Sequence, residues 1–268
     1  MEAKKKKFIK ELLTKPRARR ESGLYIVDGP KMCSEINKSE IDDIFVTKEF
    51  LESEHAISCK VLLESSNYEI VSTSDMKQLS DTVTPQGIIA VVRQKRNLDL
   101  SEIVNYDKSV KPLIFILEKL QDPGNLGTII RAAEAAGVTG IIMSSDCADI
   151  YSPKVVRSTM GALFRVPFMI SEDLCALVNE IKTVRYTDGD KFNIYAAHLR
   201  GAKEYDLLSY TEPTAVMIGN ESRGLSDKLT ACADQAVKIP MCGTVESLNA
   251  AMAAAIIMFE AGRQRRHI

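Results

Sequence analysis

The chain has 268 residues, of which 45% are hydrophobic and 26% charged, and its formal net charge is -1. Such a length holds one large domain or two ordinary ones with buried cores, and the composition excludes a disordered or fibrous protein. No run of about 18 apolar residues occurs, so we expect no membrane span. The basic start "MEAKKKKFIK" lacks the apolar stretch of a signal peptide, so we expect a cytoplasmic protein.

Cysteine usage argues against a metal centre and against a disulfide scaffold. The cysteines are Cys33, Cys59, Cys147, Cys175, Cys232 and Cys242, and the histidines are His55, His198 and His267. None of them forms a CxxC pair or a Cys/His cluster with the spacing of a zinc site. We therefore expect free thiols in a reducing compartment and no bound metal.

Basic residues gather at both ends of the chain. Residues 1–20 carry nine lysines and arginines against two glutamates, and the C-terminal "GRQRRHI" adds three arginines. Clusters of this kind are typical of proteins that bind a phosphate backbone. A solvated tail that aids solubility would have the same composition, so both interpretations stay open.

The first part of the chain reads as a small α/β unit. The short apolar runs "LYIVDG", "DDIFVT", "EIVST" and "GIIAVVRQ" alternate with helical patterns and indicate strands. The polar stretch that follows has no long apolar run. We therefore predict a first domain at residues 1–95, a linker at 96–111 and a second domain at 112–268.

The second part repeats an apolar run followed by a helical pattern. Apolar runs occupy residues 113–118, 140–145, 167–171, 192–199, 214–221 and 236–241, and helical patterns occupy 125–137, 152–166, 172–182 and 247–265. This alternation predicts a parallel sheet with helices on both faces. A ligand site is then expected beyond the carboxyl ends of the strands.

Polar residues follow the first of these runs, in "EKLQDPGNLGTIIRAAEAAG". Residues 122–125 form a predicted turn, and a helix is expected to begin near Leu126 with Asn125 as its cap. Arg131 falls about two turns into that helix. A helix cap and a surface arginine would be the plain interpretation, but it leaves their clustering at one strand end unexplained.

The stretch "GNESRGLS", residues 219–226, follows a later apolar run. It lacks the spacing of a dinucleotide fingerprint and the GK[ST] of a phosphate loop. The carboxylate of Glu221 would repel a pyrophosphate and suits a cationic ligand or an arginine. Ser226 is in position to cap another helix.

The last motif is "VKIPMCGTVESLNAAMAAAIIMFEAG". Pro240 ends the strand and Gly243 permits a tight turn, and either Ser247 or Asn249 is expected to cap the long helix that follows. Small residues along this helix allow it to approach another backbone closely.

These three motifs resemble, in order and spacing, the signature motifs of the SpoU RNA 2'-O-ribose methyltransferases of the SPOUT superfamily. The segments "YIVDGPKMCSEI" and "TPQGIIAVV" are similar to the ribosomal-protein-like substrate-binding domain of the ribosomal-RNA members. The resemblance implies an α/β fold in which a small α/β RNA-binding domain precedes a parallel-sheet domain with a deep trefoil knot. It also implies a homodimer.

The resemblance further implies S-adenosylmethionine as cofactor and a ribose 2'-hydroxyl of ribosomal RNA, of the 23S type, as substrate. The implied cofactor contacts are Gly219, Ile239, Met241 and Leu248, and the implied catalytic group is Arg131 with Asn125, Glu221, Ser247 and Asn249 orienting it and the ribose. Free arginine is effectively never deprotonated, which favours an electrostatic clamp over a general base for Arg131. Ser222 and Arg223 stand where many relatives carry a glycine and another residue, which leaves substrate preference open.

The sequence leaves other functions open. A transfer-RNA ribose methyltransferase is the main alternative among enzymes, although such members usually lack this kind of N-terminal domain. A non-catalytic RNA-binding protein with a methylase-like domain is the second alternative, but every polar residue of the motifs is retained. The missing glycine fingerprint argues against a nicotinamide dehydrogenase.

Overall fold

The computed structural model describes residues 1–186, 189–199, 201 and 203–266, and the chain divides into two compact units. The first unit comprises Met1–Arg96 and Asp149–Phe164, and the second comprises Asn97–Ala148 and Arg165–Ile268. In the described part of the chain, no helix has the length and apolar character that crossing a bilayer requires.

The first unit is built on a mixed sheet, which has four strands among the described residues in the order β1-β4-β2-β3. The strands are β1 (Leu24–Asp28), β2 (Ile41–Val46), β3 (Glu69–Ile70) and β4 (Ile88–Arg93). The central strand β4 pairs antiparallel with β1 and β2, and β3 runs parallel to β2. All four strands lie in apolar runs that the sequence indicated as strands.

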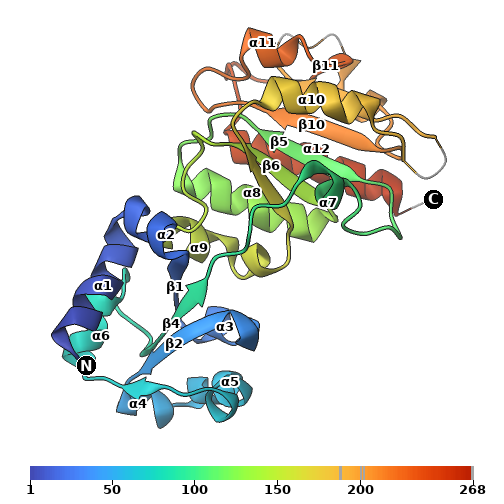
Figure 1. The fold of residues 1–268 in the computed structure, drawn as a ribbon. Coiled ribbons are helices and arrows are strands. Elements are labelled where there is room, and N and C mark those ends of the chain that lie inside the picture. The colour runs from blue at the N-terminus through green and yellow to red at the C-terminus, as the bar shows by residue number, and fades with distance from the viewer. Residues whose placement is uncertain (187–188, 200, 202, 267–268) are drawn as a thin grey trace. The chain divides into compact units, whose positions relative to one another are not determined.

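Helices cover this sheet (Figure 1). They are α1 (Ala3–Thr14), α2 (Pro16–Ser22), α3 (Pro30–Cys33), α4 (Lys48–Leu51), α5 (Lys60–Ser65), α6 (Thr73–Leu79) and α9 (Pro153–Thr159), with 3-10 turns η1 (Lys38–Glu40), η2 (Glu54–Cys59) and η3 (Ala162–Phe164). The helices α1 and α6 lie side by side, and their apolar residues Ile9, Leu12, Met76 and Leu79 pack against the sheet. The unit therefore has its own hydrophobic core.

The second unit is built on a parallel sheet, and seven strands of it lie among the described residues in the order β7-β6-β5-β10-β8-β11-β9. The strands are β5 (Leu113–Leu117), β6 (Gly140–Ser144), β7 (Phe168–Ser171), β8 (Asn193–Ala197), β9 (Lys203–Glu204), β10 (Thr214–Ile218) and β11 (Gln235–Lys238). Every pairing is parallel. The sheet confirms the predicted α/β class with a parallel sheet.

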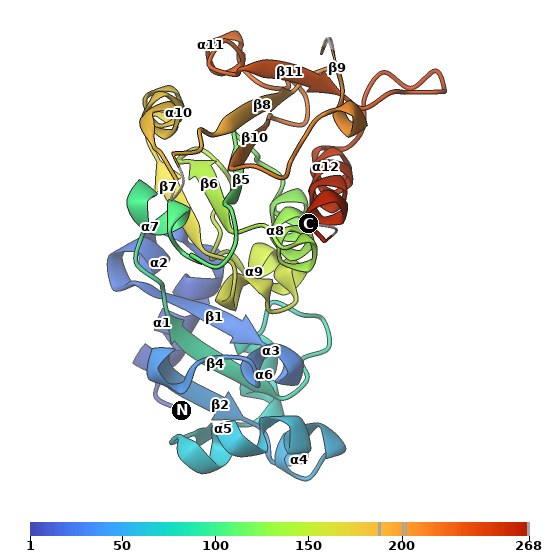
Figure 2. The same ribbon diagram turned by 90° about the vertical axis from the view of Figure 1, so that its right-hand side faces the viewer.

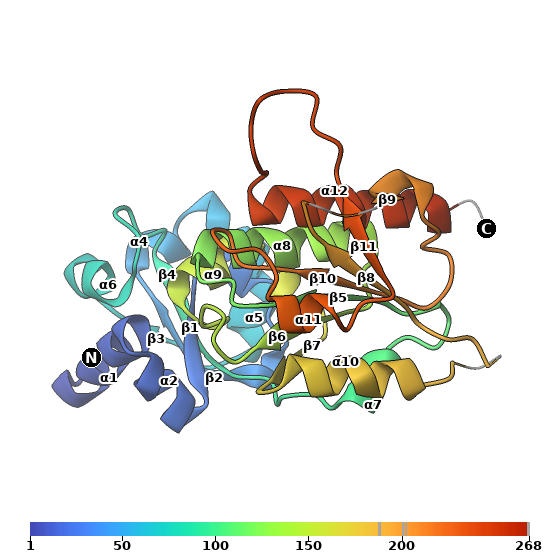
Figure 3. The same ribbon diagram turned by 90° about the horizontal axis from the view of Figure 1, so that it is seen from above.

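Helices cover both faces of this sheet, as a parallel sheet requires. They are α7 (Leu100–Val104), α8 (Pro123–Ala136), α10 (Leu174–Thr183), α11 (Asp227–Thr230) and α12 (Ala250–Arg265), with the 3-10 turn η4 (Tyr205–Leu207). Figures 2 and 3 show α8 and α12 on one face and α7 and α10 on the other. The central strands β5 and β10 are fully buried between them.

The helices α8 and α12 pack closely because small residues face each other. A Cβ added at Gly262 of α12 would lie 2.8 Å from the carbonyl oxygen of Ala136 in α8. The expectation that small residues bring the last helix close to another backbone is thus confirmed, and that backbone is the one that carries Asn125 and Arg131.

The predicted helix at residues 152–166 is wrong in its length. The helix α9 ends at Thr159, because Met160 and Gly161 adopt φ values of 50° and 94° and turn the chain into η3.

The predicted linker at residues 96–111 contains the helix α7. It begins at a capping box in which Asp99 and Glu102 each accept a hydrogen bond from the other's backbone N–H. Leu100, Ile103 and Val104 add to the core of the second unit.

Many of the basic residues near the two ends have internal partners. Arg19 is 3% exposed and pairs with Asp149 at 2.7 Å. Lys5 pairs with Asp43 at 3.0 Å. Arg265 donates hydrogen bonds to the carbonyls of Lys111, Pro112, Tyr210 and Glu212, and burial lowers its pKa to about 10. Arg265 is therefore structural, whereas Arg266 and, on α1, Lys4 and Lys7 stay exposed.

Candidate active site

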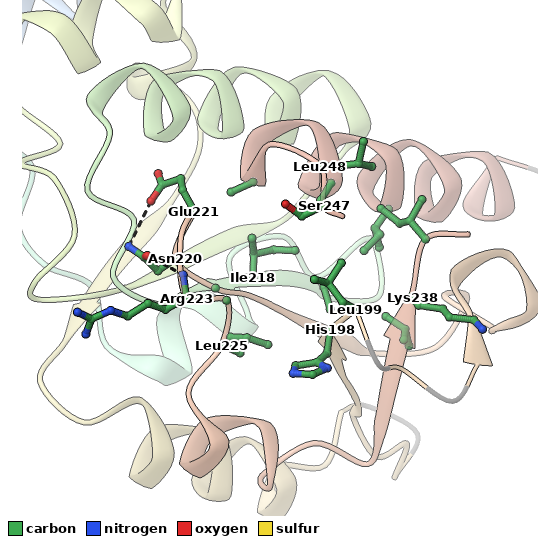
Figure 4. Close-up of a pocket in the computed structure, with 18 of the residues that line it drawn as sticks. His198, Leu199, Ile218, Asn220, Glu221, Arg223, Leu225, Lys238, Ser247 and Leu248 are labelled. Atoms are coloured by element: carbon green, nitrogen blue, oxygen red, sulfur yellow. Dashed lines mark hydrogen bonds between the residues drawn. The ribbon is translucent and has the colours of Figure 1, made fainter. Parts of the chain in front are cut away.

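The carboxyl ends of β8, β10 and β11 open into a cavity of about 500 Å³ (Figure 4). We call it the strand-end cavity, and it is lined by Ala197, His198, Leu199, Ile218–Leu225, Asp227, Val237–Ile239, Met241, Ser247, Leu248, Ala250, Ala253 and Ile257. Its place agrees with the expected position of a ligand site in a parallel sheet. Its walls come from the second and third motifs.

The loop after β10 folds back on itself directly at Gly219. A backbone bridge joins Asn220 and Gly224, with N–O distances of 3.1 and 2.8 Å, and Gly224 has a φ of 69°. A Cβ added at Gly219 would lie 2.1 Å from the carbonyl carbon of Gly224. Glycine is required here because the returning segment of the same loop occupies the space of a side chain.

The first motif begins its helix earlier than predicted. The helix α8 starts at Pro123, and its cap is Asp122, whose Oδ1 accepts a hydrogen bond from the N–H of Asn125 at 2.8 Å. The prediction of Asn125 as the cap is wrong, because the turn Asp122-Pro123 already supplies both the capping carboxylate and the proline of the first turn. The Asn125 side chain is therefore available for tertiary contacts.

A chain of side-chain hydrogen bonds joins the three motifs. Nδ2 of Asn249 donates to Oδ1 of Asn125 at 2.9 Å, and Nδ2 of Asn125 donates to Oε1 of Glu221 at 3.0 Å. Asn249 also caps α12, because its Oδ1 accepts from the N–H groups of Ala251 and Met252. The open choice between Ser247 and Asn249 as the cap is thus decided for Asn249, and the capping role fixes one end of the chain.

The loop 219–226 is also anchored to the end of β5. The buried carboxylate of Glu118, 8% exposed, accepts hydrogen bonds from the N–H and the hydroxyl of Ser226, both at 2.7 Å. Ser226 caps α11 by accepting from the N–H of Leu229, which confirms its predicted capping role. Nδ2 of Asn220 donates to the carbonyl of Lys119 at 2.7 Å. Both ends of the loop are therefore held by residues 118–119.

A second cavity, of about 1010 Å³, adjoins the first along this loop. We call it the polar cavity, and it is lined by Glu118, Lys119, Gln121, Asp122, Asn125, Asn220–Ser226 and Asn249. The loop 220–225 is a wall of both cavities. Groups bound in the two cavities would meet at this wall.

The predicted site residues divide between the two cavities. Gly219, Ile239, Met241, Leu248 and Ser247 line the strand-end cavity. Asn125 and Asn249 line the polar cavity, and Glu221 lines both. Arg131 lines neither: it lies exposed on α8, six residues after Asn125 and so about 9 Å further along the helix axis.

Sequence reasoning missed the residues that follow β8 and β5. Ala197, His198 and Leu199 line the strand-end cavity, and the backbone N–H of His198 donates to the carbonyl of Val237 in β11. Glu118 was part of a quoted motif but received no role. Both sets directly follow predicted strands, so the rule that ligands bind at strand ends could have found them.

Comparison with known proteins places the chain in a family. Residues 112–259 match the SpoU rRNA Methylase family, and residues 4–90 match the MRM3-like substrate binding domain. The chain belongs to the SpoU rRNA methylase family. The matched segment contains all three motifs, so the resemblance drawn from them is confirmed.

Individual relatives of the SpoU rRNA methylase family agree with this assignment. The chain is 30% identical to the 23S rRNA (guanosine(2553)-2'-O)-methyltransferase RlmP of Bacillus subtilis, covering 93% of this chain and 92% of the relative. It is 32% identical to the mitochondrial rRNA methyltransferase 3 of mouse, of which it spans only 57%. The SpoU methyltransferase AviRb of Streptomyces viridochromogenes, solved with S-adenosylmethionine, superimposes with a TM-score of 0.85 at 28% identity over 99% of both chains.

The strand-end cavity suits the cofactor of SpoU methyltransferases, S-adenosylmethionine. Its volume of about 500 Å³ lies within the usual range for ligand pockets. Apolar side chains such as Leu225, Ile239 and Leu248 offer surface for an adenosine, and the carboxylate of Glu221 is compatible with a sulfonium cation. Among the described residues, no group of three or more His, Cys, Asp and Glu is placed to hold a metal ion, and His267 lies outside them.

Proposed function

We propose that this protein transfers a methyl group from S-adenosylmethionine to a ribose 2'-hydroxyl of ribosomal RNA, of the 23S type. The observation that carries the proposal is the hydrogen-bond chain from Asn249 through Asn125 to Glu221. It draws all three family motifs together at the wall between the strand-end cavity and the polar cavity. The named activities of the relatives support the same reaction.

In this proposal the strand-end cavity holds the cofactor. Gly219, Ile239, Met241 and Leu248 line that cavity and would hold it largely through backbone groups. The cofactor supplies an electrophilic methyl group on a sulfonium sulfur. Gly219 and Gly224 let the loop close on itself, so that its backbone groups are fixed before the cofactor binds.

The polar cavity would then receive the ribose. In-line transfer needs oxygen, methyl carbon and sulfur in a row, and rigid positioning alone can supply several kcal/mol of the barrier. Asn125 is fixed by two hydrogen bonds, and Glu221 also accepts from Nδ2 of Asn220 at 3.3 Å. We assign Asn125, Glu221, Ser247 and Asn249 to orienting the ribose and the catalytic arginine.

Arg131 acts in this proposal as an electrostatic clamp on the developing alkoxide or on the neighbouring phosphate. A guanidinium keeps its proton in proteins, so it stabilises negative charge far better than it removes a proton. Because Arg131 lies outside both cavities of its own chain, we propose that it serves the site of a second copy in a homodimer.

The outer face of α12 supports the homodimer. Met252 and Phe259 are 56% and 48% exposed, and they lie seven residues apart, on one side of the helix. Exposed apolar side chains of this size next to a cofactor site are typical of a surface that a partner covers. The knotted arrangement of the last segment and a cytoplasmic location are further parts of the proposal, and the six free cysteines support a reducing compartment.

The first unit would bind the RNA substrate. Its match to a substrate binding domain supports this role, as do the exposed side chains of Lys4, Lys7 and Arg20 on α1 and α2. Cations on a helix surface attract the phosphate backbone without reading its sequence. Replacing these three residues by glutamine should weaken RNA binding in a salt-dependent way and leave cofactor affinity unchanged.

The proposed substrate class is tested by offering separated RNAs. Purified protein is incubated with cofactor labelled in its methyl group and either ribosomal or transfer RNA from the same cells. Label in the ribosomal RNA alone is the expected result. Label confined to transfer RNA would show that transfer RNA, and not ribosomal RNA, is the substrate. No label in either RNA would favour an RNA-binding role without catalysis.

A further inference from the structure

The polar cavity contains a lysine in an unusual backbone conformation. Lys119, directly after β5, has a φ of 55°, a region that non-glycine residues rarely adopt. Its N–H donates to Oγ of Ser144 at 2.9 Å, and its carbonyl accepts from Nδ2 of Asn220 at 2.7 Å. Backbone strain of this kind persists where surrounding contacts enforce it, and it is concentrated at functional sites.

The carboxylates around the polar cavity already accept hydrogen bonds from groups of the protein itself. Glu118 accepts two hydrogen bonds from Ser226, and Asp122 caps α8. Glu221 accepts from the side-chain amides of Asn125 and Asn220. Their negative charge is therefore already compensated by fixed hydrogen-bond donors.

The positively charged side chains of the polar cavity are less fully compensated by partners within the protein. Within the described residues, the guanidinium of Arg223 has no hydrogen-bond or ion-pair partner, and the residue is exposed. Lys119 has an ion-pair distance of 3.5 Å to Asp146, and both side chains are about half exposed. Such an exposed ion pair contributes little to the free energy of folding. Lys119 can therefore exchange Asp146 for another anion. Two cations are thus available to a ligand at this cavity.

The two cations belong to neighbouring strands. Lys119 follows β5 and Arg223 belongs to the loop after β10, and these strands pair in parallel. The position of Arg223 is fixed by Asn220, whose Oδ1 accepts from the N–H groups of Ser222 and Arg223 at 2.9 and 3.2 Å. In Figure 4 the Arg223 side chain points away from the strand-end cavity.

We infer that Lys119 and Arg223 bind phosphate groups of the RNA strand on either side of the ribose that enters the polar cavity. The inference rests on the proposed function and adds the anchor of the substrate. Arg223 can bind a phosphate with two parallel hydrogen bonds, whereas Lys119 acts as a point charge.

The test measures RNA affinity as a function of salt for the full-length protein. The variants are Lys119→Gln, Arg223→Gln and the double variant, and the probe is a labelled transcript of 23S ribosomal RNA in filter binding. Each single variant should bind more weakly, and the slope of log affinity against log salt should fall by about 0.7 to 0.9 for each phosphate that the variant no longer neutralises. The affinity for S-adenosylmethionine should stay unchanged in Lys119→Gln, because Lys119 does not line the strand-end cavity.

Lys228→Gln is the matched control, since Lys228 is exposed on the adjacent α11 but does not line the polar cavity. Slopes equal to that of the parent protein, or an equal loss in the control, would overturn the inference. A parent protein that binds the transcript but transfers no methyl group would refute the proposed function, and the slopes would still decide on the two cations. A parent protein that binds no RNA would refute both.

Discussion

Nδ2 of Asn125 donates a hydrogen bond to Oε1 of Glu221 at 3.0 Å, and this contact joins the first and second motifs across 96 positions of the chain. The contact forms because Asp122 caps α8 and leaves the Asn125 amide unused by the helix end. A carboxylate that would otherwise point freely into a cavity is thereby held at the wall between the two cavities.

Asn125→Ala should lower the rate of methyl transfer about 10- to 100-fold, because it removes a hydrogen bond to a charged group worth about 1.5 to 3 kcal/mol. Cofactor affinity should change little, since Asn125 lines only the polar cavity. Steady-state kinetics and calorimetry measure the two quantities. Asn105→Ala, which removes an exposed amide bound to Ser101, is the control, and an equal rate loss there would contradict the assignment.

Gly219→Ala should abolish cofactor binding and lower the melting temperature. The added Cβ would lie 2.1 Å from the backbone of Gly224, so the loop must move, and both cavities lose their shared wall. Gly243→Ala is the matched control, because nothing lies within 4 Å of its added Cβ and its φ is ordinary. Normal cofactor affinity in Gly219→Ala would show that the loop is not part of the binding site.

Arg131→Ala should lose methyl transfer and keep the cofactor affinity of the parent protein, because Arg131 lines neither cavity of its own chain. Arg131→Lys retains the charge but not the planar donor fork, so it should recover only part of the activity. Mixing Arg131→Ala with a variant defective in cofactor binding should restore activity if the arginine serves a second copy. Failure of that mixture, with heterodimers demonstrated, would contradict the shared site.

The carboxyl group of Asp28 in the first unit should make the stability of the folded protein depend on pH. Burial raises the pKa of its carboxyl group, and the hydroxyl of Ser80 only partly offsets this. The folded state therefore holds the proton more tightly than the unfolded chain, so stability falls as the pH rises from about 4 through the raised pKa. The substitution Asp28→Asn should abolish this fall in stability, because asparagine does not titrate.

Thermal unfolding at several pH values measures the effect. The melting temperature of Asp28→Asn relative to the parent protein should increase from pH 4 to pH 7, whereas the exposed Asp206→Asn should show no such trend. A constant difference across this range would mean that Asp28 does not titrate abnormally.

The alternation of apolar runs with helical patterns predicted the two sheets, because buried strands read as apolar runs that turn signals separate. The strand β9 has only two residues and α11 only four, and such short elements leave no periodic pattern. The end of α9 at Met160 depends on a left-handed residue that is not glycine, which local propensity does not predict.

The sequence selected candidate residues of the site, but it did not predict how those residues contact one another. Strand-end placement and motif resemblance selected Asn125, Glu221 and Asn249, yet the hydrogen bonds among them join residues 96 and 124 positions apart. No local rule fixes such contacts. The same limit applies to Arg265, which the sequence presents as a basic tail residue but which tertiary packing directs onto four carbonyls.

The proposed function is methyl transfer to a ribose 2'-hydroxyl of ribosomal RNA by the site between the two cavities. The most direct measurement incubates 23S ribosomal RNA with labelled S-adenosylmethionine and the parent protein or Glu221→Gln, and then digests the RNA with alkali. We expect label in an alkali-resistant dinucleotide for the parent protein and a strong loss of label for Glu221→Gln. Label in mononucleotides after digestion, or equal labelling by Glu221→Gln, would contradict it.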